Sequence, residues 1–340
     1  MLNIKDFEQI CLSNRILSNI NRFAEYGNIC YAMKANSSEP VIKAVSRKTS
    51  NFSISNIRHY NILNKLKVDS INMCVINVLL SNDELMCLYK NGVRFFTFDN
   101  FESLKVFINS IDEYTDLKIS LRLNIAEVFN KEKVPFGATS NEIYKMMSFL
   151  KSKNIKYGLS FYIQSEFKKN KNALIAILSY IKRNFKDYQF TSISGIGFLS
   201  NEEKAFIKRY KYICKEIIFD LGTAIVNDAI IIKTPILRKI ELPGKDIVII
   251  KNGIYGGFFD ILLCNRKYDF YIKNTKLQYE RLRNHRRIDI YGGSCDSRDF
   301  IGTFYVPKDL RIKGSILIKN AGAYFIDFLM PYQPISFKNT

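Results

Sequence analysis

The sequence predicts an α/β chain that forms a (β/α)8 barrel followed by a C-terminal antiparallel β domain. Between about residues 25 and 225, eight short apolar runs alternate with longer segments whose apolar residues recur every three or four positions. After residue 226 the chain continues as β-branched and aromatic runs broken by Gly, Pro and Asn, without helical segments between them. Since 340 residues suffice for two domains, we expect the barrel at 22–226 and the β domain at 227–340 together with 1–21.

Each apolar run of the first part has the length of one barrel strand. We expect these strands at 28–35, 50–55, 70–76, 92–99, 117–125, 156–163, 190–198 and 214–222. The segments between them predict exterior helices at 40–48, 57–66, 82–91, 100–111, 140–153, 171–185 and 202–211. Eight strands with helices between them fit a closed barrel better than an open sheet, and such barrels carry their chemistry at the carboxyl ends of the strands.

The composition argues against several classes of protein. Only two histidines are present and the seven cysteines are scattered without a CxxC pair, so we expect no metal site, disulfide framework or Ser-His-Asp triad. No apolar run approaches the ~20 residues that cross a bilayer, and the N-terminus lacks the pattern of a signal peptide. We therefore expect a cytoplasmic protein without a membrane span, whose chemistry depends on a cofactor.

The net charge of +19 has two explanations. It would attract nucleic acid, nucleotides or acidic proteins, but a general bias toward lysine gives the same number without any polyanionic partner. The densest basic stretch, at 281–287, is either a phosphate-binding patch or a solvated loop. No helix-turn-helix, zinc or RNA-binding signature is present, so nucleic acid is not an expected partner.

The first segment that suggests chemistry is YAMKAN at 31–36, where the first barrel strand ends. Lys34 is expected at the mouth of the barrel. A desolvated lysine amine loses its proton more readily, and an unprotonated amine is the nucleophile that forms a Schiff base. Lys34 is therefore a candidate catalytic residue.

YAMKAN resembles the pyridoxal-phosphate lysine motif of the fold-type III decarboxylases, which include the ornithine, diaminopimelate and arginine decarboxylases. Further motifs follow in the family's order, closest to its ornithine branch. They are GVRFFTFDNFESLKVF, LRLNIAEVF, VPFGA, GLSFYIQSE and ISGIGF in the barrel, and NGIYGGFFD, GGSCDSRDFIG and NAGAYF in the β domain. The resemblance covers about residues 25 to 335. It implies an alanine-racemase-like barrel, pyridoxal 5'-phosphate (PLP) as cofactor and amino-acid decarboxylation.

The resemblance assigns PLP to the mouth of the barrel. It implies that Lys34 holds PLP as a Schiff base, while the protonated pyridine ring serves as the electron sink for decarboxylation. Asp220 stands where the family has a glutamate that pairs with the ring nitrogen. Gly195 and Gly197 would let backbone N–H groups approach the phosphate.

Four more residues match positions close to the cofactor in the family. Tyr162 replaces a histidine that stacks on the pyridine face, and a phenol ring can also stack. Ser165 would add a hydroxyl donor, and Tyr324 matches a tyrosine that reaches the phosphate. Arg122 matches a barrel arginine near the cofactor.

The resemblance also implies a homodimer with two shared active sites. Cys295, in GGSCDS, would reach the active site of the partner protomer and protonate the reacting carbon. Asp296 beside it would bind the distal amine of a diamino acid. Cys264 and Tyr332 are further candidates for substrate binding.

The chain departs from the family pattern at several positions. Thr223 stands where the family has a phosphate-binding arginine, and Cys264 stands where ornithine decarboxylases have a second substrate-binding aspartate. Ser53 replaces an aspartate after the second strand, and the phosphate loop reads Gly-Ile-Gly rather than Gly-Gly-Gly. The chain has little room for the family's N-terminal β strand.

These residues support one leading hypothesis: decarboxylation of the α-carboxylate of an ornithine-like or lysine-like amino acid, or of a larger conjugate with an amino-acid head, in specialised biosynthesis. Loss of negative charge near Cys264, together with the net charge of +19, suggests a small-molecule or carrier-borne substrate with an anionic tail.

The alternative is a catalytically silent homologue that binds and regulates a partner protein. Thr223, Ser53 and Tyr162 favour it. Retention of Lys34, Cys295, Asp296 and Tyr324 argues against it. A racemase of related barrel fold is a third option, but racemases need a tyrosine base opposite the lysine rather than the GGSCDS motif.

Overall fold

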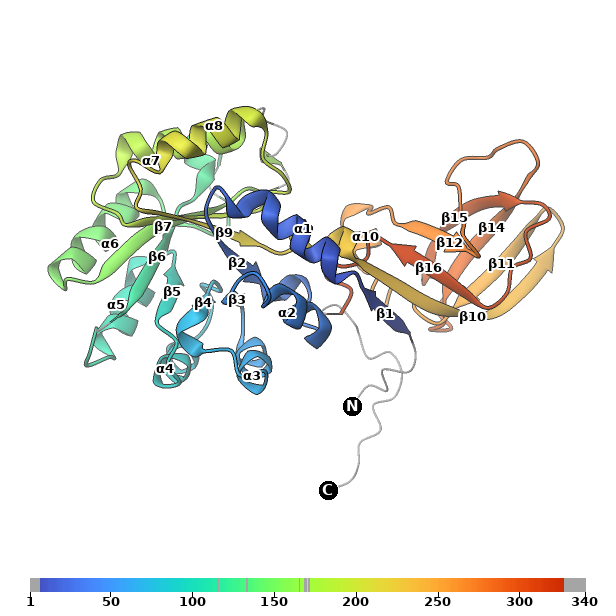
Figure 1. Ribbon diagram of the computed structural model, residues 1–340, viewed down its shortest axis with the longest axis horizontal. Coiled ribbons are helices and arrows are strands. Elements are labelled where there is room, and N and C mark those ends of the chain that lie inside the picture. Colours follow the sequence, from blue (N-terminus) through green and yellow to red (C-terminus); the bar gives the residue numbers. More distant parts are fainter. Residues whose placement is uncertain are drawn as a thin grey trace, which may run out of the picture. The chain divides into compact units, whose positions relative to one another are not determined.

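The structure, a computed structural model, describes residues 7–326 except 115, 133, 165, 168, 169 and 171. It contains two compact units (Figure 1). The barrel unit comprises Leu17–Lys34 and Lys43–Ala224, and the sheet unit comprises Met1–Ile16, Ala35–Ile42 and Ile225–Thr340. Within the described residues, no helix combines the length and the apolar character needed to span a membrane.

The barrel unit contains a closed barrel of eight parallel strands. Its strands are β2 (Asn28–Ala32), β3 (Asn51–Ile54), β4 (Met73–Val75), β5 (Phe95–Phe98), β6 (Lys118–Arg122), β7 (Lys156–Tyr162), β8 (Phe190–Ser194) and β9 (Glu216–Leu221). The barrel closes where β9 pairs with β2, with Asp220 opposite Cys30. All eight strands lie inside the predicted apolar runs, so the predicted barrel is confirmed.

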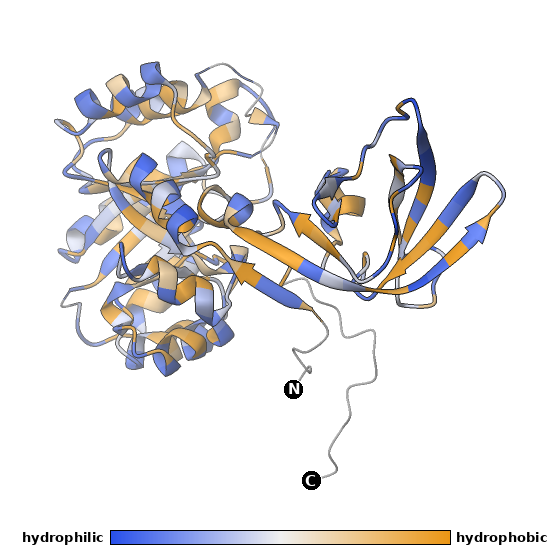
Figure 2. Cartoon of the chain, turned by 45° about the vertical axis from the view of Figure 1, so that its right-hand side comes forward, coloured by the Kyte–Doolittle hydropathy of each residue, from blue (hydrophilic) through white to orange (hydrophobic). Residues whose placement is uncertain are grey.

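Helices follow the strands as the three-to-four periodicity predicts. They are α2 (Glu39–Val45), α3 (Ile57–Lys65), α4 (Asn82–Lys90), α5 (Phe101–Asn109), α6 (Ser140–Ser152), α7 (Ala173–Asn184) and α8 (Asn201–Tyr210). Capping boxes, from Ser81 with Glu84 and from Ser200 with Glu203, fix the starts of α4 and α8. Figure 2 shows hydrophilic and hydrophobic stretches alternating along these helices. The sequence analysis did not predict α1 (Ser13–Ala24) or the short α9 (Thr223–Val226).

The barrel interior changes from apolar to polar along the strands. Phe190 and Ile218 pack with Cys30 and Cys74 near the amino ends of the strands. Two residues further along the same strands, Ser192 and Asp220 line a cavity, because alternate residues of a strand face the same side. The apolar layer supports the barrel, and the polar layer above it provides the chemistry.

The sheet unit contains an eight-stranded sheet in the order β13-β12-β16-β10-β11-β14-β15, with β1 paired to β10. The strands are β1 (Glu8–Cys11), β10 (Ile230–Leu242), β11 (Lys245–Ile250), β12 (Asp269–Ile272), β13 (Thr275–Lys276), β14 (His285–Gly292), β15 (Phe300–Pro307) and β16 (Ser315–Lys319). All pairs are antiparallel except β11 with β14. One short helix, α10 (Asp260–Cys264), interrupts these strands.

The expectation that the chain has little room for an N-terminal strand is wrong. β1 pairs antiparallel with β10, with Glu8 opposite Lys233 and Cys11 opposite Ile230. The Lys233 ammonium also forms an ion pair with Glu8 at 2.8 Å. A strand of four residues is sufficient here, because the exposed edge of β10 supplies its backbone partners.

Candidate active site

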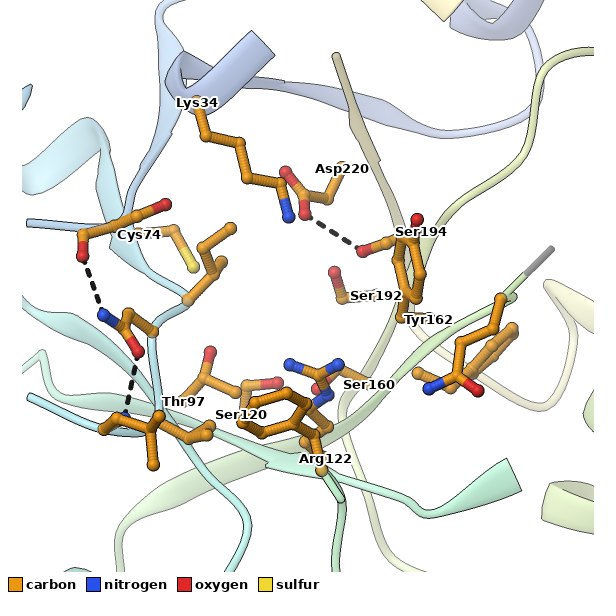
Figure 3. A pocket seen from close by; sticks show the side chains of 18 residues that line it. Lys34, Cys74, Thr97, Ser120, Arg122, Ser160, Tyr162, Ser192, Ser194 and Asp220 are labelled. Atoms are coloured by element: carbon orange, nitrogen blue, oxygen red, sulfur yellow. Dashed lines mark hydrogen bonds between the residues drawn. The ribbon is translucent and has the colours of Figure 1, made fainter. Parts of the chain in front are cut away.

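A cavity of about 450 Å³ lies at the carboxyl ends of the barrel strands (Figure 3). Each of the eight strands, or the segment directly after it, contributes at least one lining side chain. All of the lining residues belong to the barrel unit. Three of them carry charge, namely Lys34, Arg122 and Asp220. This is the position at which a barrel of this class is expected to carry its chemistry.

Lys34 lies in a single 3-10 turn, Met33–Ala35, directly after β2. Its side chain extends into the cavity (Figure 3), and its Nζ lies 5.6 Å from the centre of the Tyr162 ring. Tyr162 ends β7, so the two side chains come from different parts of the barrel wall. Lys34 and Tyr162, which the resemblance assigns to the same cofactor, therefore lie side by side in one cavity.

Asp220 is a buried carboxylate held by two hydroxyl groups. Its Oδ1 accepts a hydrogen bond from Ser53 Oγ at 2.5 Å, and its Oδ2 accepts one from Ser194 Oγ at 3.0 Å. Burial raises the pKa of the neighbouring thiols Cys30 and Cys74 well above the ordinary value, and the charge of Asp220 raises it further. Both thiols therefore stay protonated, and Asp220 is the charged group on this side of the cavity.

Arg122 faces the same cavity from the end of β6. Burial lowers the pKa of its guanidinium, and Asp99 and Asp220 oppose that shift. The guanidinium carbon lies 5.4 Å from the centre of the Phe136 ring. No residue in the described part of the chain accepts a hydrogen bond from it. A largely buried cation without an acceptor is suited to binding an anionic group.

The turn that carries Phe136 is held by two residues that the sequence analysis missed. Asn124 Nδ2 donates to the carbonyls of Val134 at 2.9 Å and Phe136 at 3.3 Å. The Gly137 amide donates to Asp99 Oδ2 at 3.0 Å, and its φ of +104° excludes most side chains. Asn124 and Asp99 directly follow β6 and β5, so the rule that barrel chemistry follows the strands could have found them.

Three buried hydroxyl groups in the cavity wall have no hydrogen-bond partner among the described residues. They belong to Ser55, Ser120 and Ser160. Leaving a buried hydroxyl unpaired costs about 1–3 kcal/mol, so these groups indicate a polar ligand or ordered water. The sequence analysis did not select them, although their alternate spacing with apolar residues places them inside the barrel.

The glycines of the Gly195-Ile-Gly197 loop differ in role. A Cβ at Gly195 would lie 2.5 Å from the carbonyl oxygen of Ile163, and the residue has φ of +83°. The close approach of the chain after β7 therefore explains this glycine by itself. A Cβ at Gly197 would meet nothing within 4 Å, which leaves open space beside the loop. Ser165, the predicted hydroxyl donor, lies outside the described residues.

In the sheet unit, Cys295 and Tyr324 have left-handed backbone conformations, with φ of +62° and +70°. Nine of the thirteen described non-glycine residues with positive φ are Asn or Asp, which tolerate it better. The Tyr324 amide donates to the Ala35 carbonyl at 2.6 Å, and Ala35 directly follows Lys34. Strained residues of this kind concentrate at functional sites.

Asp296 is already paired within the sheet unit. Arg298 donates to it through Nε at 3.1 Å and Nη2 at 2.7 Å, and the Tyr255 hydroxyl donates at 3.2 Å. The hydrogen bonds from Arg298 lower the pKa of Asp296 to about 2. Cys264 is exposed at the end of α10, where its Sγ donates to the Asp260 carbonyl at 3.1 Å. Tyr332 lies outside the described residues.

One glycine of NGIYGG and one of GGSCDS pack against the same buried carboxylate. A Cβ at Gly253 would lie 2.1 Å from Asp299 Oδ1, and a Cβ at Gly292 would lie 2.2 Å from Asp299 Oδ2. Asp299 accepts hydrogen bonds from the amides of Ile254 at 2.5 Å and Ser294 at 3.3 Å. Gly253 and Gly292 thus share one structural reason: only a residue without a side chain leaves room for Asp299.

The family model described as "Pyridoxal-dependent decarboxylase, pyridoxal binding domain" matches residues 13–194, more than half of the chain. The chain belongs to this family. The predicted PLP-dependent amino-acid decarboxylase and its cofactor are thereby confirmed, and the silent homologue is not favoured. The match does not distinguish the predicted ornithine branch from the other branches of the family.

Solved structures show that this decarboxylase shares a fold with characterised enzymes. A lysine/ornithine decarboxylase from Vibrio vulnificus matches with a TM-score of 0.77 at 16% identity, covering 96% of this chain and 92% of that chain. The arginine decarboxylase of Paramecium bursaria Chlorella virus matches with a TM-score of 0.77 at 18% identity, covering 96% of this chain and 92% of that chain. The lysine decarboxylase of Selenomonas ruminantium matches with a TM-score of 0.76 at 17% identity, covering 96% of this chain and 89% of that chain. No curated protein matches by sequence.

The residues lining the cavity of this decarboxylase fit PLP. A lysine amine and a carboxylate without a cation partner face one cavity, and the buried hydroxyls of Ser120 and Ser160 there have no partner among the described residues. When bound, PLP supplies an electron sink for the negative charge left by decarboxylation. The protein's contribution is to hold the cofactor, orient it and supply protons.

Proposed function

We propose that this decarboxylase removes the α-carboxylate of an amino acid, ornithine-like or lysine-like or a larger conjugate with an amino-acid head, with PLP bound covalently to Lys34. The observation that carries the proposal is the meeting of Lys34 with the buried carboxylate of Asp220 in one cavity at the carboxyl ends of the barrel. Lys34 would release the cofactor to the substrate amine and recapture it afterwards. Asp220 would hold a proton on the pyridine nitrogen.

The remaining predicted residues of the barrel would bind and orient the cofactor. Tyr162 flanks the Lys34 amine, so its ring would cover one face of the cofactor. The open space beside Gly197 would admit the phosphate, and Arg122 would bind an anionic group. Gly195 would shape the same loop.

We further propose a homodimer in which the Cys295 thiol reaches the partner's cavity and donates the proton that replaces the lost carboxylate. The thiol is exposed and its backbone is strained, which supports a functional position. Tyr324 would reach the phosphate, and Tyr332 would contact the substrate.

The substrate tail would be anionic or carrier-borne rather than a free ammonium. In the motif predicted to bind a distal amine, Asp296 is paired with Arg298 at 2.7 Å. An ammonium would have to compete with that guanidinium, and Cys264 offers an uncharged thiol in place of a second carboxylate. The local charge at this subsite is therefore near neutral, which weakens the attraction for an ammonium and is compatible with a nucleotide conjugate or carrier-protein thioester.

The first test is an absorbance spectrum of the purified full-length protein before and after borohydride reduction, followed by peptide mapping. We expect a Schiff-base band that disappears on reduction and a pyridoxyl group on Lys34, with Lys34→Ala as the matched control. A pyridoxyl group on another lysine, or no uptake of PLP, contradicts the proposal. A CO2-release screen across amino acids and their conjugates then identifies the substrate. Fast turnover of ornithine or lysine without turnover of any conjugate contradicts the proposed tail.

A further inference from the structure

Both oxygens of the Asp220 carboxylate accept a hydroxyl hydrogen bond, and the two donors come from different strands. Ser194 is the register partner of Asp220 across the parallel pair β8 and β9. Ser53 lies on β3, separated from β9 by β2. On β2, which lies between them, Cys30 is the register partner of Asp220 and Ala32 is that of Ser53, so both intervening side chains are small. Ser53 and Asp220 are both buried, at 1% and 8% exposure.

This arrangement differs from an ordinary buried salt bridge, because no cation lies within ion-pair distance of Asp220 among the described residues. Hydroxyl donors fix the orientation of a carboxylate without cancelling its charge. Two hydroxyls occupy only part of its capacity, since an ionised carboxylate accepts about four hydrogen bonds. Negative charge and acceptor sites therefore remain for a ligand in the cavity.

We propose that Ser53 and Ser194 are positioning residues that hold the Asp220 carboxylate toward the pyridine nitrogen of PLP. The inference rests on the proposed function in one respect, that Asp220 is the acidic partner of that nitrogen. An aspartate has one methylene fewer than a glutamate, so its carboxylate has less reach. The two hydroxyls fix the shorter side chain from two directions.

The same geometry explains why a serine suits position 53. A carboxylate in place of the Ser53 hydroxyl, which lies 2.5 Å from Asp220 Oδ1, would bring two negative charges into contact. Two carboxylates that close share one proton, and a protonated Asp220 could not hold a proton on the ring nitrogen. A neutral hydroxyl avoids this conflict while keeping the hydrogen bond.

The test compares Ser53→Ala and Ser194→Ala with the wild type, using the full-length protein stripped of cofactor and titrated with PLP. Losing one hydrogen bond to a charged group should weaken PLP binding by about tenfold in each variant. The absorbance spectrum of the bound cofactor should also change its pH dependence, because the ring nitrogen loses its proton more readily. Ser194→Thr keeps the hydroxyl and should retain the wild-type spectrum.

Thr191→Val is the matched control. Thr191 lies on β8 directly before Ser192, and its buried hydroxyl contacts Tyr210 and Cys214 outside the cavity. The substitution therefore removes a buried hydroxyl from the same strand without touching Asp220. We expect its PLP affinity and spectrum to equal those of the wild type. A second comparison places Ser53→Ala in an Asp220→Asn background, where it should have no further effect on PLP affinity.

The outcomes separate the two proposals. If the wild type binds PLP and both alanine variants match it in affinity and spectral pH profile, the positioning role is wrong while the proposed function stands. If Thr191→Val weakens PLP binding as much as Ser194→Ala, the effect comes from the strand and the positioning role is again wrong. If the wild type takes up no PLP at saturating concentration, the proposed function fails and the inference fails with it.

Discussion

Buried carboxylates have different partners in the two units. In the sheet unit, Asp246, Asp260 and Asp289 each form an ion pair, and Asp299, packed against two glycines, accepts hydrogen bonds from backbone amides. In the barrel unit, Asp220 has two hydroxyl partners and no cation among the described residues. Full pairing inside a unit supports folding, whereas partial pairing beside a cavity leaves interactions for a ligand to complete.

Asp260 shows what full pairing means. Its Oδ2 lies 2.6 Å from Arg266 Nη1, and its Oδ1 accepts from the Tyr268 hydroxyl at 2.6 Å. Arg266 also donates to the Asn320 carbonyl at 2.9 Å. The Asp260 carboxylate and the Arg266 guanidinium therefore satisfy each other's charge and leave none for a ligand. The cavity differs, since Lys34 and Arg122 face it without a carboxylate at ion-pair distance among the described residues.

The largest expected effect is that of Lys34→Ala. We expect turnover to fall by roughly a thousandfold or more, as when a covalent catalytic group is lost, with the melting temperature of the cofactor-free protein unchanged. The reason is that Lys34 makes no ion pair in the described structure. Steady-state CO2 release and a thermal melt measure the two quantities. Retained turnover would contradict the proposed catalytic role of Lys34.

Asp260→Asn should destabilise the protein more than any single change in the cavity. Removing one partner of a buried ion pair leaves the other charge unpaired, which costs about 3–5 kcal/mol. Denaturant unfolding of the cofactor-free protein measures the loss. A cost equal to that of Ser120→Ala would contradict the distinction between the two units.

Ser120→Ala should leave the stability of the cofactor-free protein unchanged or raise it by about 1 kcal/mol, because the buried hydroxyl it removes has no partner among the described residues. The same denaturant experiment applies. A marked loss of stability would mean that this hydroxyl is satisfied, and that incomplete pairing does not mark the cavity.

Arg298→Leu should raise the pKa of Asp296 from about 2 toward the ordinary 3.8. The folded-state pKa is depressed, so the stabilising contribution of ionised Asp296 is present above pH 3.8 and is lost as the pH falls through about 2. In the variant the folded-state pKa approaches the unfolded value, so this pH-dependent contribution should shrink toward zero. Carboxyl NMR titration of wild type and variant measures the shift, with Ser297→Ala as the neighbouring control.

The same variant tests the proposed substrate. Freed from Arg298, Asp296 should accept a distal ammonium, so turnover of free ornithine or lysine should rise by about tenfold relative to the wild type. A fall in turnover of these diamino acids would show that Arg298 helps to bind them, against the proposed anionic tail.

The sequence by itself determined the barrel, because strand and helix periodicities are local: the alternation at 190–194 and the three-to-four spacing at 201–210 each lie within one segment. It also placed Lys34 at the mouth of the barrel, because its motif is six contiguous residues at the end of the first barrel strand. The short β1 was missed because four residues carry little pattern and depend on β10 for pairing.

Only the tertiary structure decided which side chains meet. Ser53 reaches Asp220 across 167 residues of sequence, and Asp299, just before β15, packs on both Gly292 and the more distant Gly253. In the sequence, Ser53 is noticed only because it replaces an aspartate of the family pattern. In the barrel, its hydroxyl donates a hydrogen bond to Asp220. Periodicity reports which face a residue occupies, but its partner depends on how strands far apart in the chain come together, and that is set by packing of the whole barrel.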